Sequence, residues 1–218
     1  MKLLIETQDF SHFEVLTEGE GSSKNLFISG PFIQTEVVNR NGRKYIKETV
    51  SKEIARYIKE KVDTNRALGE LNHPAHPDVN PERAAIKIIS LTENGNDFVG
   101  KAKVLESVPM GAIVGGLIRE GVQLGVSSRG LGSIREEKGY KVVCEDFRLM
   151  TAADVVSDPS APDAFVTALM ENKEWVWEGG KLVEREVEIR DTINTLSKTG
   201  KLTNEALERV FHKILSLV

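Results

Sequence analysis

Apolar residues between Ile46 and Val62 recur every three or four positions, and charged residues fill the opposite face of that pattern. This spacing predicts an amphipathic helix. A shorter stretch, Gly111–Arg119, repeats the pattern and predicts a second helix. Short apolar runs bounded by turn residues predict two strands within 25–38, divided at Gly30–Pro31. Further strands are predicted at 83–91 and 98–104, joined by an Asn-Gly turn at 94–95, and at 122–134, 140–149 and 152–156. Because strands and helices do not alternate regularly, the order of elements predicts an α+β fold.

The two ends of the chain differ from its middle. Residues 1–24 are polar and finish in a stretch of Gly and Ser, so we expect a short apolar start and then a loop that is flexible or removed by processing. Beyond about residue 170, the pattern predicts a hairpin on a Gly-Gly turn at 175–183 and an amphipathic helix at 202–218. The chain therefore divides into a domain of residues 1–170 and a tail of residues 171–218.

The composition narrows the class of protein. The chain has 218 residues, which suffices for one core without disulfides or a structural metal. Its single cysteine, Cys144, cannot pair within the chain, which is typical of proteins outside oxidising compartments. The net charge of −4 argues against a protein that coats DNA, so no specific nucleic-acid partner is expected. Every apolar stretch is too short to span a bilayer, so we expect a soluble protein that does not bind membranes.

Three places along the chain carry candidate chemistry. His73 lies in a proline-rich loop, Ser127 and Ser128 lie in an apolar run with several glycines, and Asp154 lies in a short apolar run. A hydroxyl attacks a peptide only when an imidazole removes its proton, and a carboxylate orients that imidazole. His73, one of the two serines and Asp154 together supply these groups. The residues alone leave open which serine is used, and a turn histidine beside solvated serines is the simpler interpretation.

A second interpretation of the same loop is a metal site. His73, His76 and Asp78 supply nitrogen and oxygen ligands, as in a metal-dependent hydrolase. The prolines between them prevent the helix that fixes the spacing in the His-Glu-x-x-His zinc motif. We therefore expect neither a metal nor another cofactor.

Four longer blocks carry a resemblance to a known family. They are Val37–Asn41, Ala67–Pro74, Gly125–Ser133 and Pro159–Ala164. In this order they resemble the prohead core protein proteases of T4-like tailed bacteriophages, over about residues 3–167. The resemblance implies a serine endopeptidase with the fold of the herpesvirus assembly proteases, a β-barrel surrounded by helices. The hydrophobic pattern adds a helical C-terminal tail.

The resemblance also assigns the catalytic residues. The catalytic histidine falls on His73 and the nucleophile on Ser127. Asp154 is the preferred third member, because it starts the strand that precedes the Pro-Ser-Ala-Pro loop, and the alternative is a dyad of His73 and Ser127. Ser128 then points to the other face of its strand, because side chains alternate along a strand.

Groups that contact the substrate are implied as well. An oxyanion hole is expected from Arg129 or from the backbone of Ser160 and Ala161. Members of the family cut after glutamate in apolar-x-Glu segments. Two such segments of this chain end at Glu6 and Glu184, so self-cleavage is expected after one or both of these residues.

The resemblance further implies the setting in which the protein acts. Its substrates would be phage scaffold, core and capsid proteins inside the prohead, in the host cytoplasm during assembly. By analogy with the herpesvirus enzymes, we expect a homo-oligomer, most simply a dimer. The alternative class is a non-catalytic scaffold or core-assembly protein, because the tail of residues 171–218 suits self-association.

Overall fold

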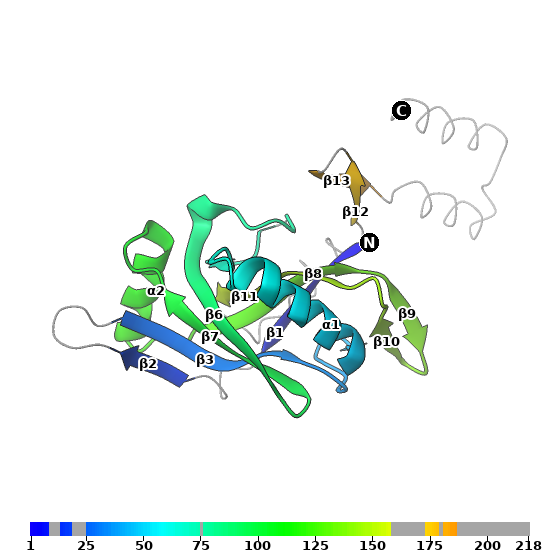
Figure 1. The fold of residues 1–218 in the computed structure, drawn as a ribbon, viewed down its shortest axis with the longest axis horizontal. Coiled ribbons are helices and arrows are strands. Elements are labelled where there is room, and N and C mark those ends of the chain that lie inside the picture. The colour runs from blue at the N-terminus through cyan, green and yellow to red at the C-terminus, as the bar shows by residue number, and fades with distance from the viewer. Residues whose placement is uncertain (9–13, 19–24, 75, 158–172, 179–180, 187–218) are drawn as a thin grey trace.

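The computed structural model of the chain consists mainly of strands (Figure 1). It describes residues 1–8, 14–18, 25–74, 76–157, 173–178 and 181–186. The strands of this part form two five-stranded sheets and one three-stranded sheet, and two α-helices accompany them. A mainly β structure with separate helices agrees with the expected α+β class.

The first sheet carries the candidate chemistry. Its strands follow the order β11-β8-β1-β12-β13. They are β1 (Lys2–Gln8), β8 (Gly125–Gly132), β11 (Arg148–Val156), β12 (Lys173–Glu178) and β13 (Lys181–Glu186). Strand β1 pairs with β8 along its whole length, from Lys2 opposite Gly132 to Gln8 opposite Val126. The N-terminal segment therefore lies in the middle of this sheet.

The remaining described strands form the other two sheets. The second has the order β2-β3-β7-β6-β5 and the third the order β4-β10-β9. The strands of the second sheet are β2 (Glu14–Glu18), β3 (Asn25–Gln34), β5 (Leu68–Glu70), β6 (Ala84–Asn94) and β7 (Asp97–Val104). Those of the third are β4 (Arg43–Lys44), β9 (Ile134–Glu137) and β10 (Tyr140–Val143). None of these described sheets closes on itself, so the expected barrel is not confirmed.

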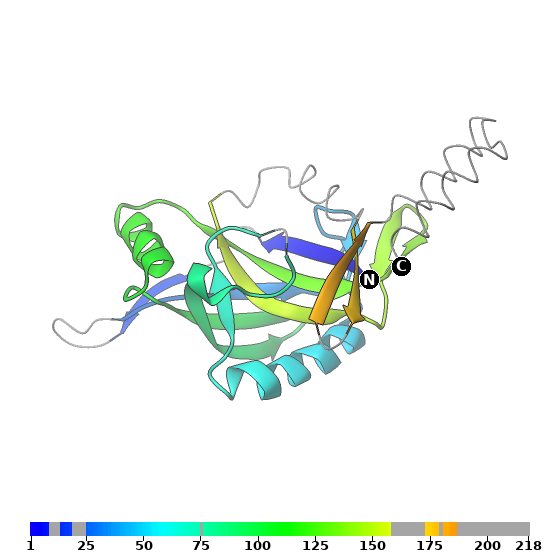
Figure 2. The same cartoon turned by 90° about the horizontal axis from the view of Figure 1, so that it is seen from above.

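The two helices predicted within residues 1–170 are confirmed. Helix α1 (Lys47–Tyr57) continues into a π-helical turn (Ile58–Val62), and α2 spans Pro109–Arg119. Proline suits the first turn of α2, because the N–H that it lacks would have no partner within the helix. In Figures 1 and 2, α1 runs along one side of the sheets, whereas α2 lies at the opposite end of the molecule from β9 and β10. A short 3₁₀ helix, Pro81–Arg83, precedes β6. Among the described residues, no helix is both long and apolar enough to cross a membrane.

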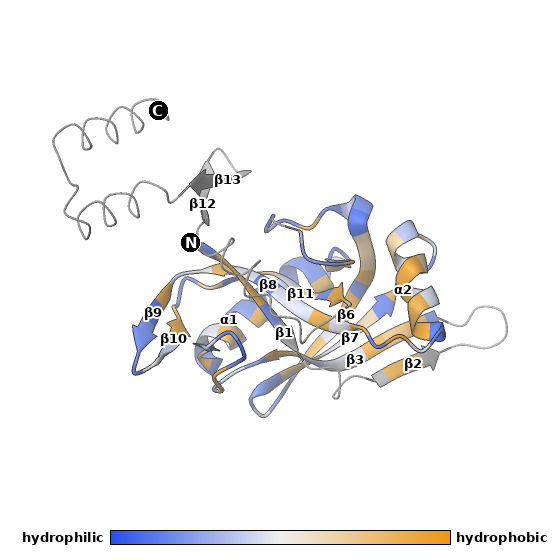
Figure 3. Ribbon diagram, turned by 180° about the vertical axis from the view of Figure 1, so that it is seen from behind, coloured by the Kyte–Doolittle hydropathy of each residue, from blue (hydrophilic) through white to orange (hydrophobic). Residues whose placement is uncertain are grey.

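The main core lies between the two large sheets and α1 (Figure 2). Leu4, Val126 and Ala153 belong to it from the first sheet, and Phe32 and Ile86 from the second. All five side chains are almost completely buried. Figure 3 shows hydrophobic residues along these strands and on α2, and hydrophilic residues at the tip of the β6–β7 hairpin. That tip is the predicted Asn-Gly turn, where Gly95 has a φ of 61°.

The structure differs from the predicted elements in several places. The predicted strand at 140–149 ends at Val143, and Arg148 and Leu149 belong to β11. Residues 2–8 and 14–18 form β1 and β2, so the expectation of a loop is wrong there, because long-range pairing with β8 and β3 orders these segments. Residues 25–34 form one strand, not two. Its register with β7 shifts between Pro31 and Ile33, which is the place of a β-bulge. The proline thus bends the strand without ending it.

The tail is described only in part. The predicted hairpin is confirmed as β12 and β13, and Glu174 of β12 pairs with Lys2 of β1. The predicted helix at 202–218 lies outside the described residues. The hairpin therefore extends the first sheet, and the division near residue 170 stays a prediction.

Candidate active site

Three chain segments meet at the candidate site. Strand β5 leads into the loop that carries His73, β8 carries Ser127 and β11 carries Asp154. The loop is fastened to β11, because the Asn72 N–H donates to the Val155 carbonyl oxygen over 2.8 Å. Leu71 also forms a parallel bridge with Val155. These backbone contacts bring His73 beside Asp154 although 81 positions separate them in the sequence.

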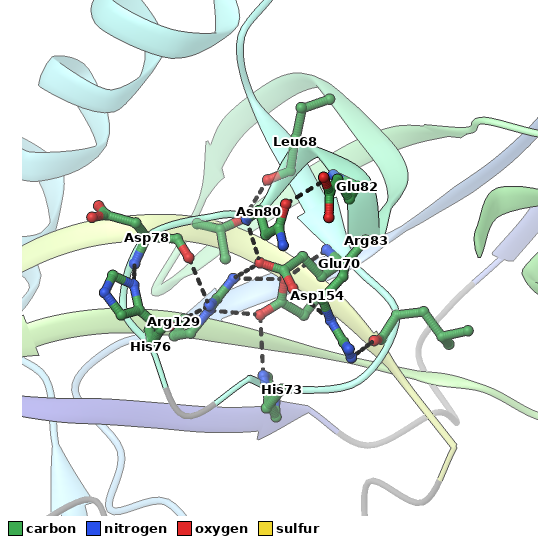
Figure 4. Close-up of polar contacts among 12 residues, drawn as sticks. Leu68, Glu70, His73, His76, Asp78, Asn80, Glu82, Arg83, Arg129 and Asp154 are labelled. Carbon is green, nitrogen blue, oxygen red and sulfur yellow. Dashed lines mark hydrogen bonds and ion pairs between the residues drawn. The ribbon is translucent and has the colours of Figure 1, made fainter. Parts of the chain in front are cut away.

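His73 and Asp154 are in contact in a buried environment (Figure 4). The His73 Nδ1 atom lies 3.1 Å from Asp154 Oδ2, and the side chains of these residues are 7% and 0% exposed. The other ring nitrogen, His73 Nε2, is buried and has no hydrogen-bond partner among the described residues. If Nδ1 carries the proton toward the carboxylate, Nε2 is the nitrogen that accepts a proton from a nucleophile.

Ser127 lies directly opposite Asp154 in the pairing of β8 with β11. Between this pair and the pair Arg129–Thr151, β11 has one residue more than β8, which is a β-bulge. The bulge places Asp154 on the face that carries Ser127 and Arg129. Ser128 points to the other face, as the alternation predicts, and lies opposite Glu6 of β1. The predicted trio of His73, Ser127 and Asp154 is therefore brought to one face of the first sheet.

A buried guanidinium lies behind Asp154 (Figure 4). Arg129 Nε lies 2.9 Å from Asp154 Oδ2, and Arg129 Nη2 donates to Asp154 Oδ1 over 3.3 Å. The same Nη2 donates to Glu70 Oε1 over 3.2 Å, and Nη1 donates to the His76 carbonyl oxygen over 2.6 Å. Arg129, Glu70 and Asp154 are all fully buried. The three nitrogens face carboxylates and loop carbonyls, which favours a role beside Asp154 over the predicted role in an oxyanion hole.

The remaining predicted groups have less support. Ser160 and Ala161 lie outside the described residues. His76 accepts a hydrogen bond from the Asp78 N–H at its Nδ1, whereas the same atom of His73 faces Asp154. Within the described ranges, no group of three or more His, Cys, Asp or Glu side chains is arranged to hold a metal ion. His73, His76 and Asp78 are therefore not gathered as ligands.

A second buried network lies on the other face of the first sheet, the face toward which Ser128 points, and it surrounds Glu6 of β1. Glu6 Oε1 lies 2.6 Å from Arg43 Nε and accepts a hydrogen bond from the Tyr45 hydroxyl over 2.8 Å. The side-chain amides of Asn39 and Asn41 donate to Glu6 Oε2. Burial raises the pKa of Glu6 above its ordinary value, although Arg43 and these donors act in the other direction. Burial and the charge of Glu6 also hold the pKa of Tyr45 well above its usual range.

Glu70 and the ion pair of Glu6 with Arg43 are absent from the sequence-based predictions. Glu70 lies three residues before His73, between the buried Gly69 and the half-buried Leu71. A charged residue in such a position is a signal of a paired, buried carboxylate, and it could have marked Glu70. Glu6 was predicted only as a cleavage site, yet it pairs with Arg43.

The two predicted self-cleavage sites lie in strands. Glu6 is 5% exposed in β1, between β8 and β12, and Glu184 lies on β13 opposite Trp175. A protease needs an extended segment that has left its sheet, so cutting after Glu6 requires the release of β1. Self-cleavage stays a prediction.

The chain is similar to known proteins in sequence and in fold. A family model described as prohead core protein serine protease matches residues 5–174. The prohead core protein protease of Enterobacteria phage T4 is 48% identical over 149 residues, which is 67% of this chain and 70% of that protein. A solved structure of the bacteriophage T4 capsid assembly protease is similar with a TM-score of 0.66 and 41% identity, and the match covers 71% of this chain and 97% of the other. This chain therefore belongs to the prohead core protein serine protease family.

Proposed function

We propose that this protein is a serine endopeptidase in which Ser127 is the nucleophile, His73 the general base and Asp154 the residue that orients the histidine. The observation that carries this proposal is the buried contact between His73 Nδ1 and Asp154 Oδ2, with Ser127 opposite Asp154 in the sheet. A histidine held in this way presents its other nitrogen to a hydroxyl.

The reaction follows from these positions. His73 Nε2 takes the proton of the Ser127 hydroxyl while the oxygen attacks the scissile carbonyl carbon. His73 then gives this proton to the leaving amine, and the peptide bond breaks to leave an acyl-enzyme. A water molecule, deprotonated by His73, cleaves the ester and regenerates Ser127. Asp154 stabilises the imidazolium that forms in each half of the reaction.

The substrates that we assign are proteins of the immature phage head. The similar T4 protein is named a prohead core protein protease and the similar solved structure a capsid assembly protease. We therefore assign scaffold, core and capsid proteins inside the prohead as substrates, cut after glutamate in apolar-x-Glu segments. The chain itself is a further substrate, after Glu6 and Glu184, once these segments leave their strands. The dimer stays a prediction.

A basic pocket that is lined in part by the loop of His73 and by β11 supports a preference for acidic substrate residues. Its volume is about 510 Å³. Residues 71–80, which carry His73 and are called the histidine loop below, contribute Asp78 to its wall, and β11 contributes Met150. Four basic side chains also line it, from Arg56, Lys61, Arg66 and Arg148. Arg66 donates to two neutral oxygens, the Thr64 hydroxyl and the Glu60 carbonyl, so these bonds leave its charge uncompensated. A pocket with these charges would favour peptides with acidic side chains.

The decisive experiment compares the two serines. Wild type, Ser127→Ala, Ser128→Ala and His73→Ala are each incubated with the cognate core protein, and fragments are followed on a gel. We expect Ser127→Ala and His73→Ala to abolish cleavage and Ser128→Ala to retain it. Asp154→Asn should fold normally and lower kcat by about 10⁴-fold, because the imidazole then adopts the wrong tautomer.

The outcomes separate the alternatives. Cleavage that persists in Ser127→Ala and stops in Ser128→Ala would overturn the assigned nucleophile. Cleavage by both serine variants would contradict the serine mechanism. A wild type that never cuts the core protein would favour the non-catalytic assembly protein. Substrates with Gln in place of Glu at the cut site test the acidic preference, and we expect them to be cut more slowly.

A further inference from the structure

We propose that Glu70 and Arg129 form a buried positioning pair for the catalytic Asp154, so that the site works with five linked residues instead of three. This inference rests on the proposed function, because it concerns the same histidine and serine. Glu70 and Arg129 act through Asp154 and the histidine loop, and neither is assigned contact with the substrate.

The first observation is the position of Arg129. It follows Ser127 by two residues on β8, so both side chains lie on one face. From there its guanidinium contacts Asp154 of β11, Glu70 of β5 and the carbonyl oxygen of His76 in the loop. A single side chain thus joins all three segments that carry the proposed catalytic residues. The planar fork of arginine suits such a role, because its donors point in fixed directions.

The second observation is how completely Asp154 is held. Its Oδ1 accepts the Glu70 N–H over 2.8 Å and the Arg129 Nη2 over 3.3 Å. Its Oδ2 lies 2.9 Å from Arg129 Nε and 3.1 Å from His73 Nδ1. The backbone and side chain of neighbouring elements therefore fix both oxygens. This leaves Asp154 one orientation, in which Oδ2 faces the imidazole.

The third observation is the charge balance. Arg129 alone would compete with His73 for the Asp154 carboxylate, and its positive charge would oppose an imidazolium nearby. Glu70, fully buried, draws the guanidinium toward its own Oε1 at 3.2 Å and supplies a second negative charge. Buried charges are tolerated when each is paired, and Arg83 Nε pairs with the other oxygen of Glu70 at 3.2 Å. Because Arg83 is 44% exposed, water screens its charge, so the two buried carboxylates outweigh the one buried guanidinium when His73 becomes positive during the reaction.

The fourth observation is that Glu70 also closes the histidine loop. Its Oε1 accepts the Asn80 N–H over 2.8 Å, so the chain returns to Glu70 after passing through His73. Arg129 Nη1 holds the same loop at the His76 carbonyl oxygen. Loss of the Glu70 charge would release Arg129 and loosen the loop together. The expected result is a misplaced imidazole, whereas the four basic side chains of the pocket lie outside this loop.

The test compares Glu70→Gln, Glu70→Asp and the control Glu53→Gln, with steady-state kinetics on a quenched peptide that contains a Leu-Val-Glu segment. Glu53 is the control for kcat, because it also pairs with an arginine, Arg56, and accepts a backbone N–H of β11, from Leu149 over 2.7 Å. Arg56 and Leu149 line the basic pocket, so an effect of Glu53→Gln on substrate binding would change KM. Functional sites are counted by labelling Ser127 with a fluorophosphonate, so that unfolded protein does not enter kcat. We expect Glu70→Gln to lower kcat per labelled site by about 10²-fold, with KM nearly unchanged.

Two further results complete the test. Glu70→Asp should recover part of the lost kcat, because it restores the charge. Glu70→Gln combined with Arg129→Met should lose little more than Arg129→Met alone, because both act through one contact. The inference would be overturned if Glu70→Gln and Glu53→Gln had equal kcat. It would also be overturned if the losses of the two single variants multiplied fully in the double variant. Neither result would contradict the serine mechanism. Activity in Ser127→Ala would instead overturn the proposed function and this inference with it.

Discussion

Substitution of Gly69 by alanine tests whether close contact of β5 and β11 sets the geometry of the site. A Cβ at this position would lie 1.9 Å from the Ala153 carbonyl oxygen, whereas Cβ contacts under 3.0 Å essentially do not occur. The two strands must therefore separate by about 1 Å at this point, because a packed interior offers no other relief. The next residue of each strand forms the 2.8 Å hydrogen bond from the Glu70 N–H to Asp154 Oδ1, and the separation would break it.

We expect Gly69→Ala to lower kcat by about 10²-fold, since a displacement of 1 Å has this effect on aligned groups. The free energy of unfolding should fall by about 1–3 kcal/mol through overpacking. The assays are peptide cleavage, corrected for labelled sites, and urea unfolding. The control is Gly116→Ala in α2, where a Cβ would meet nothing within 4 Å. The free energy of unfolding of Gly116→Ala should rise by about 0.5–1 kcal/mol, and its kcat should equal that of wild type. Wild-type kcat in Gly69→Ala would refute the argument.

Two further predictions concern stability. Because burial raises the pKa of Glu6 above its ordinary value of 4.5, the native state holds this proton more tightly than the unfolded chain does. The stability from this proton is complete below pH 4.5 and is lost as the pH rises through the raised pKa. In urea unfolding, wild type should therefore lose stability relative to Glu6→Gln as the pH rises toward 7, and a constant difference would contradict this. Gly100→Ala should lower the free energy of unfolding by about 1–3 kcal/mol, because its Cβ would lie 2.1 Å from the Phe32 ring. Its kcat per labelled site should equal that of wild type, and a large loss would show that the second sheet also shapes the site.

The sequence predicted the elements that depend on local patterns. The helices at α1 and α2 and the β6–β7 hairpin follow from helical spacing and an Asn-Gly turn, so they were found in nearly the right places. Strand β1 was missed, because its order comes from pairing with β8 more than a hundred residues later. The local sequence of residues 2–8 does not indicate which distant strand they pair with.

The chemistry of the site divides in the same way. The types of these residues, and the resemblance of four sequence blocks to a known family, were enough to mark His73, Ser127 and Asp154 as candidates. The reaction needs a base, a hydroxyl and a carboxylate, and these residues supply them. Only the tertiary structure decided that these residues share one face, since a bulge in β11 turns Asp154 toward Ser127. It also decided what surrounds Asp154. Glu70 and Arg129 are 59 positions apart, and only the packing of β5 against β11 and β8 gives each buried charge its partner.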